Sequence, residues 1–302
     1  MKTSPVSIAD LHRSVISVPP LCRNADLHSD AAENAKLIRH IEGGGVSTLL
    51  YGGNANFYNL AVSEYEEVLS QLEAAAASDT WIVPSVGPYY GTAMDQAAVL
   101  RRMKFPTAMM LPTIAVSHPE GVRNSVQRFT EKAGIPVVLY VKDQNYVTPK
   151  VIQELVESGL ISWIKYAVVR EDPSVDSLLQ AIIDVVGPAR IVSGIGEQPA
   201  LAHWQVFGVH AYTSGCVCVA PSLSQEMLGA MQAGYFEKAL EIQAKFSALE
   251  TLRNIHGPIP VLHHAVALAG IAATGHLLPL LADLPAALHG QIELAANNLR
   301  AY

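Results

Sequence analysis

Charged residues are scarce in this chain. They make up 16% of its 302 residues, whereas hydrophobic residues make up 50%; soluble domains usually carry about a quarter of charged residues. The formal net charge of −7 and the lack of any tract rich in lysine or arginine argue against a surface for nucleic acid or anionic membranes. So many apolar residues can form a large core, and the low charge predicts a homo-oligomer.

Cysteine is also rare. Cys22, Cys216 and Cys218 are too few for a disulfide framework, and the last two, set among valines, are expected to pack in the core. Residues 1–10 lack the apolar segment of a signal peptide. The apolar stretch 265–281 contains glycine, histidine and proline, unlike a membrane span. We therefore expect a soluble, cytoplasmic protein.

Two phosphate-binding signatures are missing, namely G-x-G-x-x-G and the P-loop. The chain instead alternates short apolar runs with longer helical patterns, as in parallel sheets covered by helices. The eight runs are 14–18, 47–51, 81–86, 107–111, 136–141, 162–167, 189–193 and 209–213. This count predicts an α/β fold, a (β/α)8 TIM barrel. A doubly wound sheet is the alternative, but it normally carries a glycine-rich first turn.

Several helix starts are marked by capping signals. These are Ser29, Ser63 with Glu66, Thr148-Pro149 and Asp172-Pro173. After about Pro221 the strand signals end, and the rest predicts helices over 224–233, 235–254, 259–274 and 284–301. We therefore predict a barrel over residues 1–222 and a C-terminal helical domain over residues 223–302.

One lysine lies in an apolar environment. Lys165 is part of the run 163–169, WIKYAVV, which is typical of a strand buried on both faces. Lysine is rarely buried without a partner or a chemical role. Burial disfavours the ammonium form, lowers the pKa and leaves a neutral amine that can attack a carbonyl. The alternative is a lysine at a strand end whose amine reaches water or a carboxylate.

Other polar residues follow the carboxyl ends of the predicted strands, where barrel enzymes place their reactive groups. They are Gly52, Gly53 and Asn54, Tyr140 and Lys142, Arg170, Gly194 and Ser214. The N–H groups of a Gly-Gly turn can hold a carboxylate, and a tyrosine beside an amine can move protons. Together with Lys165, these residues indicate a site for a 2-oxo acid.

Two cations near this end of the barrel have two possible roles. Lys142 and Arg170 could bind a second acid group of the substrate, or they could be solvated loop charges paired with Asp143 or Glu171. No spacing typical of a metal site is present, so we expect no metal.

The ordered set of motifs resembles the dihydrodipicolinate synthase and N-acetylneuraminate lyase family of Schiff-base barrels. The resemblance covers about residues 11–288. It includes the turn at Gly52, the strands that carry Tyr140 and Lys165, the strand beginning at 208–209, and the segment 256–261, HGPIPV, which is similar to the family's N-P-I-P-V. It implies that Lys165 forms an imine with the keto group, that Tyr140 relays protons, and that the protein is a homotetramer.

The chain departs from the family at its second strand. The usual G-T-T-G-E is replaced here, with Gly53, Asn54 and Asn56 in place of two hydroxyl residues and the acid. The run 52–60, GGNANFYNL, is most similar to the G-G-T-G-E-F-F-S-L of sugar-acid dehydratases, and 140–145, YVKDQN, resembles their Y-N-R-D-N. The synthases' Pro-Tyr-Tyr has no match at 112–114, so a diaminopimelate-pathway synthase is disfavoured.

These observations predict a class I lyase acting on pyruvate or another 2-oxo acid. Its reaction would be aldol cleavage or condensation, or dehydration of a keto-deoxy sugar acid. Lys165 and Tyr140 are the predicted catalytic residues, and no cofactor is expected because the imine itself withdraws electrons. The alternative is a non-catalytic barrel that binds a 2-oxo acid. A metal-dependent hydrolase is disfavoured because ligands are lacking.

Overall fold

A computed structural model describes all 302 residues, and its centre is a sheet of eight parallel strands. The strands are β1 (Ile16–Ser17), β2 (Thr48–Tyr51), β3 (Trp81–Val86), β4 (Ala108–Met110), β5 (Val137–Val141), β6 (Ile161–Tyr166), β7 (Ile191–Ser193) and β8 (Thr213–Ser214). Their order is β7-β6-β5-β4-β3-β2-β1-β8, and a single parallel bridge between Ser193 and Tyr212 joins the two ends. The predicted (β/α)8 barrel is therefore confirmed.

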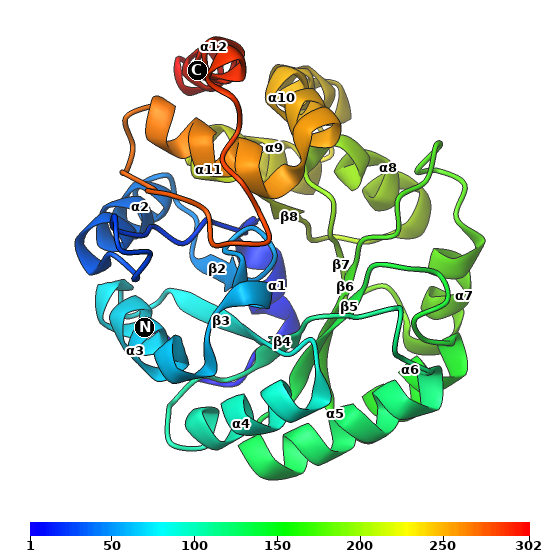
Figure 1. Cartoon of the computed structure of the whole chain (residues 1–302). Coiled ribbons are helices and arrows are strands. Elements are labelled where there is room, and N and C mark those ends of the chain that lie inside the picture. The colour runs from blue at the N-terminus through cyan, green and yellow to red at the C-terminus, as the bar shows by residue number, and fades with distance from the viewer.

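Helices surround this barrel (Figure 1). Those that precede or follow the strands are α1 (Ile8–Arg13), α2 (Ala31–Gly43), α3 (Val62–Ala75), α4 (Tyr90–Leu100), α5 (Pro119–Ala133), α6 (Pro149–Glu157), α7 (Ser177–Val186) and α8 (Glu197–Phe207), with short 3-10 helices η1 (Phe57–Asn59) and η2 (Cys216–Cys218). Every residue of the eight strands is buried, because helices cover the outer face and side chains fill the interior.

The predicted strands agree with the observed ones apart from their ends. Strand β3 has the predicted bounds, and most others are shorter by one to three residues. Strand β8 differs most, since the predicted run 209–213 pairs only from Thr213 onward. Before it, the carbonyl of Tyr212 accepts from the N–H of Ile16 at 3.0 Å, and Tyr212 forms a single bridge to Ser193, so the last strand is short.

The helix starts show which capping signals were decisive. Helix α6 begins after Thr148, whose hydroxyl accepts from the N–H of Val151, as predicted. The other three assignments were wrong. Helix α2 is capped by Asp30 instead of Ser29. The cap position of α3 is Ala61, so Ser63 is the second residue of that helix and not its cap. Serine and aspartate are about equally good caps, so local propensity does not decide between Ser29 and Asp30; in the structure the carboxylate of Asp30 accepts from the N–H groups of Ala32 and Glu33.

The start of α7 was also predicted too early. The carboxylate of Asp172 accepts from the N–H and hydroxyl of Ser174, which forms a local turn. The cap of α7 is Asp176, which accepts from the N–H groups of Leu178 and Leu179. Both aspartates carry the same local signal, and only the second also receives bonds from elsewhere in the barrel.

Four helices follow the barrel and lie together along one side of it (Figure 1). They are α9 (Pro221–Gln232), α10 (Phe236–His256), α11 (Pro258–Leu268) and α12 (Ala286–Arg300). Helix α10 packs against α8, α9, α11 and α12, and its buried residues recur every three or four positions: Ala239, Ile242, Phe246, Leu249, Glu250 and Arg253. The same buried face therefore carries apolar residues first and two charged residues at its end. The domain boundary at residue 222 stays a prediction.

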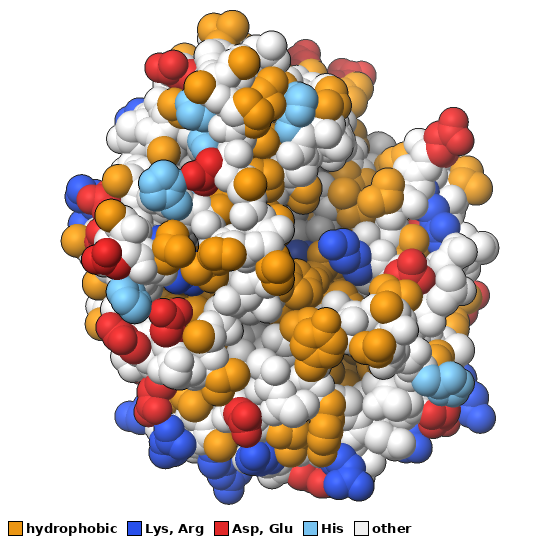
Figure 2. All heavy atoms as spheres, viewed as in Figure 1, with side chains coloured by type: hydrophobic (Ala, Val, Ile, Leu, Met, Phe, Trp, Pro, Cys, Tyr) orange, Lys and Arg blue, Asp and Glu red, His pale blue; other side chains and the backbone are white.

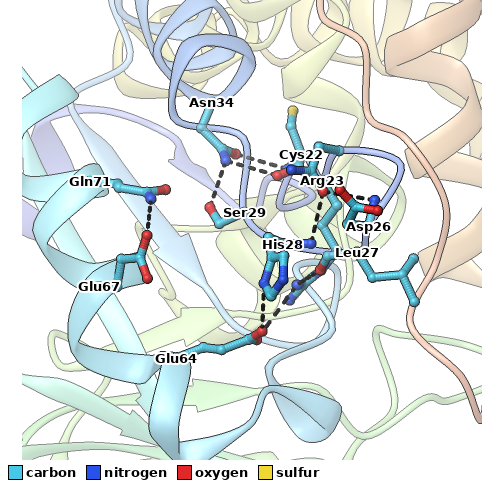
Figure 3. A network of polar contacts seen from close by, with 11 residues as sticks. Cys22, Arg23, Asp26, Leu27, His28, Ser29, Asn34, Glu64, Glu67 and Gln71 are labelled. Atoms are coloured by element: carbon cyan, nitrogen blue, oxygen red, sulfur yellow. Dashed lines mark hydrogen bonds and ion pairs between the residues drawn. The ribbon is translucent and has the colours of Figure 1, made fainter.

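The loop between β1 and α2 is held by a polar network (Figure 3). The side chain of Asn34 accepts from the N–H of Cys22 and donates to its carbonyl. The buried guanidinium of Arg23 donates to the carbonyl of Leu27 at 2.5 Å and has a carboxylate oxygen of Glu64 at 3.9 Å. These contacts fix the loop against α3 at the carboxyl-terminal end of the barrel.

None of the helices combines the length and the apolar composition that crossing a membrane requires.

The cap of α6 gives a direct test of this part of the fold. Thr148→Ala should lower the free energy of unfolding by about 1 kcal/mol, because the N–H of Val151 loses its acceptor. Thr148→Ser keeps a hydroxyl and should lose much less. Urea unfolding of the three proteins measures the difference, and equal losses in both variants would contradict the capping role.

Candidate active site

Lys165 and Tyr140 lie side by side at the centre of the barrel. The register of the parallel strands β5 and β6 pairs Tyr140 with Lys165, so both side chains are on the same side of the sheet. Nζ of Lys165 lies 4.6 Å from the centre of the Tyr140 ring. Lys165 is 4% exposed and Tyr140 is 9% exposed. The predicted nucleophile and the predicted proton carrier are thus neighbours in one buried place.

Burial changes the protonation of both groups. Burial, with the smaller contributions of the positive charges of Lys142 and Arg253, lowers the pKa of Lys165 to about 7. About half of the Lys165 side chains are therefore neutral near pH 7, and the neutral amine is the form that attacks a carbonyl. Burial raises the pKa of the Tyr140 phenol, so Tyr140 holds its proton.

A cavity of about 200 Å³ leads to these two residues. Of the predicted site residues, the structure brings Lys165, Tyr140, Gly53, Asn54 and Gly194 to its wall. It continues into a wider cavity of about 660 Å³ that shares part of the same lining. Figure 2 shows a hollow near the centre of this face of the molecule, with lysine or arginine side chains beside it.

The Gly-Gly turn offers unpaired backbone donors. The N–H groups of Gly53, Asn54 and Ala55 make no hydrogen bond within the protein, and the first two residues line the cavity. The side-chain amide of Asn54 donates to the carbonyl of Val18 at 2.9 Å, which fixes its position. Gly52 does not line the cavity. A Cβ there would lie 2.5 Å from Cε of Met109, so core packing accounts for this glycine.

Two of the predicted residues shape the cavity from the other side. A Cβ on Gly194 would lie 2.9 Å from Cγ of Lys165 and 2.7 Å from the carbonyl oxygen of Tyr166, so this glycine lets β7 approach the lysine stem closely. Ser214 lies behind the wall, where its hydroxyl accepts from the N–H of Val217 at 2.9 Å. Its neighbours Thr213 and Gly215 line the cavity in its place.

The two cations have different positions. Arg170 lies outside the Lys165 cavity, on the wall of the wider one, and forms an ion pair of 3.0 Å with the buried Asp176 that caps α7. Its partner is therefore neither Asp143 nor Glu171, the two partners considered from the sequence. Lys142 lines the Lys165 cavity itself and forms no ion pair.

Sequence reasoning missed the residues that enter the site from α8 and α10. Arg253, Asn254 and Glu250 line the cavity, and Glu197 lies behind them. The signal that could have found them is the pattern of α10, where Glu250 and Arg253 continue the apolar face at helical spacing. A charged residue on the buried face of a helix needs a partner or a function.

Glu197 and Glu250 form a buried carboxyl pair. Burial raises the pKa of both groups, and the two like charges oppose joint ionisation, so the pair retains a proton. The two oxygens of Glu250 accept from the first N–H groups of α8, those of Glu197 and Gln198, at 3.0 and 3.2 Å. Glu197 accepts from the hydroxyl of Ser224 at 2.7 Å.

The only group of side chains with converging metal-ligand atoms is Glu197, Cys216 and Glu250, whose donor atoms lie within 4.8 Å of one another. The guanidinium of Arg253 donates to the sulfur of Cys216 at 3.8 Å. A fixed positive charge in contact with one of three donors opposes the binding of a cation. Cys216 itself lies in η2, and all three cysteines are buried free thiols.

Comparisons with known proteins give the same fold. The chain superimposes on dihydrodipicolinate synthase from Bacillus clausii with a TM-score of 0.83 at 19% identity, covering 98% of this chain and 99% of that one. It superimposes on the sialic acid aldolase of Ruminococcus gnavus with a TM-score of 0.82 at 14% identity, covering 95% and 97%.

Sequence relatives are distant but cover much of the chain. A 4-hydroxy-tetrahydrodipicolinate synthase of Corynebacterium diphtheriae is 22% identical over 272 residues, 89% of this chain and 88% of that protein. A probable 5-dehydro-4-deoxyglucarate dehydratase of Pseudomonas syringae pv. syringae is 26% identical over 149 residues, 49% of each. The sequence profile of the dihydrodipicolinate synthetase family matches residues 14–294.

The buried amine of Lys165, with a pKa near 7, lies at the carboxyl-terminal end of the strands, which is where barrel enzymes place their active sites. The profile match extends over nearly the whole chain. The chain is also similar to a synthase and to a probable dehydratase. The chain belongs to the dihydrodipicolinate synthetase family, and it is a lyase.

The buried amine should make the stability of the protein depend on pH. The pKa of Lys165 is about 7 in the folded protein against an ordinary value of 10.5, so between these values the unfolded chain binds one more proton. Stability from this group therefore rises with pH, by at most about 1.4 kcal/mol per pH unit.

Lys165→Met should remove this dependence. Its gain in unfolding free energy over the wild-type protein should be largest at or below pH 7 and should shrink towards pH 10. Urea unfolding at several pH values measures it, with Lys104→Met as the matched control, because Lys104 is exposed and does not contribute to the pKa of Lys165. A gain that stays constant from pH 7 to pH 10 would contradict the lowered pKa.

Proposed function

We propose that this lyase works through a Schiff base between Lys165 and a 2-oxo acid, and that Tyr140 moves the protons. The observation that carries the proposal is the buried pair itself, an amine with a pKa of about 7 at 4.6 Å from the centre of a phenol ring. The resemblance of the Lys165 and Tyr140 strands to the family's imine-forming residues supports the same assignment.

The first half of the reaction forms the imine. The neutral amine of Lys165 attacks the keto carbon, and the Tyr140 phenol donates a proton to the hydroxyl that leaves as water. The phenol is suited to donate because burial keeps it protonated. The product is an iminium, whose positive charge stabilises the Tyr140 phenolate left beside it.

The second half uses the iminium as an electron sink. Electrons of a neighbouring bond flow towards the iminium nitrogen, so that a carbon–carbon bond breaks, or a proton leaves and a hydroxyl follows as water. The Tyr140 phenolate accepts the proton that is released and then returns it, either to the enamine carbon after cleavage or to the hydroxyl that leaves as water in dehydration. Water finally hydrolyses the iminium, which returns neutral Lys165 and leaves one proton on the Tyr140 phenolate. The same intermediate therefore serves aldol cleavage and dehydration of a keto-deoxy sugar acid.

The substrate would lie with its carboxylate at the turn formed by Gly53 and Asn54. Three consecutive N–H groups without acceptors support this position, since such donors hold carboxylates well. The wider cavity beyond leaves space for a longer chain than pyruvate. Lys142 at the wall is a candidate to bind a second acid group. We also expect a cytoplasmic homotetramer, which the low charge fraction and the resemblance to the family support.

Reductive trapping tests the imine. Cyanoborohydride with pyruvate should attach a reduced pyruvyl group to Lys165, detected by peptide mass spectrometry. The initial rate should rise from pH 6 to pH 8 with a midpoint near the Lys165 pKa of about 7, because only the neutral amine reacts.

Lys165→Met is the control and should give no adduct. Absence of an adduct with pyruvate and with longer 2-oxo acids alike would overturn the proposal, and would leave the non-catalytic barrel that binds a 2-oxo acid.

Tyr140→Phe tests the proton carrier. The phenol oxygen makes no hydrogen bond within the protein, so this substitution should leave the unfolding free energy nearly unchanged. Loss of a positioned acid–base group should slow reductive trapping by about 10²- to 10⁴-fold.

The buried Tyr166 provides a comparison, because its hydroxyl donates to Asp176 at 2.7 Å and is engaged in structure. Compared with Tyr140→Phe, Tyr166→Phe should lower the unfolding free energy more and should slow trapping less. If Tyr140→Phe trapped pyruvate at the wild-type rate, Tyr140 would have no part in imine formation.

A further inference from the structure

Arg253 is a buried arginine without an anionic partner. It is 9% exposed, and no carboxylate oxygen lies within ion-pair distance of its guanidinium. Its Nη1 donates to the sulfur of Cys216 at 3.8 Å, and its buried Nε has no partner. The other buried arginine, Arg23, has a carboxylate oxygen of Glu64 at 3.9 Å and a carbonyl at 2.5 Å. A buried charge without a counter-charge is costly, and such a charge is expected to have a ligand.

Burial disfavours the charge on Arg253, but the nearby groups Cys216, Glu250 and Glu197 outweigh this effect and raise the pKa of its guanidinium. No carboxylate oxygen of the Glu197–Glu250 pair lies close enough to form an ion pair with it. Glu250 directs both its oxygens to the first N–H groups of α8, and the backbone at Gly196 is in close contact with its Oε1. Burial raises the pKa of both Glu197 and Glu250, so the pair carries less than its full negative charge. The pair holds the end of α8 while Arg253 stays unpaired.

The guanidinium opens into the cavity that contains Lys165. Both side chains line it, together with Asn54 from the Gly-Gly turn. A Cβ on Gly215 would lie 2.7 Å from Nη2 of Arg253 and 2.9 Å from Nδ2 of Asn54. The guanidinium and the amide therefore meet over Gly215, where only a residue without a side chain leaves space for them.

The polar side chains that meet over Gly215 present donors, whereas the oxygens of Glu250, which also lines the cavity, are taken by the first N–H groups of α8. The guanidinium has only donors, and the Asn54 amide presents its nitrogen on this side. The turn adds the free N–H groups of Gly53 and Asn54. A cluster of donors with a fixed positive charge matches a carboxylate, which has acceptors only.

We propose that Arg253 binds the carboxylate next to the keto group of the 2-oxo acid, together with the turn at Gly53 and Asn54. The inference rests on the proposed function, because it places this carboxylate beside the carbon that Lys165 attacks. The second strand of this chain lacks the hydroxyl residues found at the same place in the family, and Arg253 supplies donors there from α10 instead. A helix outside the barrel thus provides the group that recognises the acid.

Binding can be measured apart from chemistry in the Lys165→Met background, which cannot form an imine. Titration calorimetry with pyruvate and with methyl pyruvate, its uncharged ester, gives two dissociation constants. Lys165→Met alone should prefer pyruvate. Adding Arg253→Met should weaken pyruvate binding by about 10- to 100-fold, the effect of losing a hydrogen bond to a charged group, and should leave the ester unchanged. Arg253→Lys should retain part of the preference.

The ratio of the two dissociation constants decides the proposal. A ratio that falls by about 10- to 100-fold in the Arg253→Met protein supports it, since the turn still donates to the carboxylate, and a ratio equal to that of the Lys165→Met parent overturns it. Pyruvate has a single carboxylate, so a role of Arg253 in binding only a remote acid group would also leave the ratio unchanged and overturn the proposal. If Arg253→Met does not fold, Arg253→Gln is judged by the same ratio.

Stability without ligand gives a second readout. An arginine that only holds the structure together would destabilise the protein when replaced and would leave the ratio unchanged. Arg253→Met should lower the ratio whatever its melting temperature is, because the contact that it loses is with the ligand. A lower melting temperature with an unchanged ratio would assign Arg253 to structure and overturn the proposal.

The two proposals can fail separately. If the wild-type protein traps pyruvate on Lys165 but the ratio does not depend on Arg253, the lyase mechanism stands and Arg253 has another role. If nothing is trapped while pyruvate binding still requires Arg253, the carboxylate site stands and the imine chemistry does not.

Discussion

Desolvation of one amine is the constraint on which the site depends. Strand β6 places Lys165 where apolar neighbours exclude water, and this exclusion lowers its pKa to about 7. The same exclusion makes the charged form of Lys165 destabilising in the core, so the reactivity of the amine and its cost in protein stability have one cause. The surrounding positive charges of Lys142 and Arg253 act in the same direction. Strand β6 is paired on both sides, with β5 and with β7, and these two ladders keep the unfavourable group in place.

The carboxyl-terminal helices add residues to the wall of the cavity that the strand ends form. Helix α10 spans 21 residues and contributes first to the core and then, at Glu250 and Arg253, to the wall of the cavity. Glu250 holds the start of α8, which follows the Gly194 and Gly196 turn that approaches the lysine stem. The C-terminal segment is therefore part of the site, even though the eight strands alone define the barrel.

The sequence predicted the barrel and the central pair because both follow from local patterns. Continuous apolar runs mark strands buried on two faces, and the ends of those runs place Tyr140 and Lys165 at one end of the barrel. Arg253 could not be found in this way, since its position depends on how α10 packs against α8 and the strand ends. Asp172 and Asp176 show the same limit. Either can cap a helix locally, and the bonds from Tyr166 and Arg170, which become neighbours only after folding, go to Asp176. Arg170 illustrates the converse, because closeness to a strand end in sequence did not bring it into the Lys165 cavity.

The strands are paired unevenly around the barrel, and this asymmetry separates the strands that carry the reacting atoms from the place where the pairing is shortest. The longest register joins β5 and β6, which carry Tyr140 and Lys165, whereas β7 meets the β8 side through one bridge and β8 meets β1 over two residues. Local opening requires breaking the fewest bonds at that short seam. Gly194 and Gly215, which border the cavity, lie on the seam side. The reacting atoms thus lie at the most extensively paired junction of the barrel, and we expect local opening to begin away from the amine, on the side of Gly194 and Gly215.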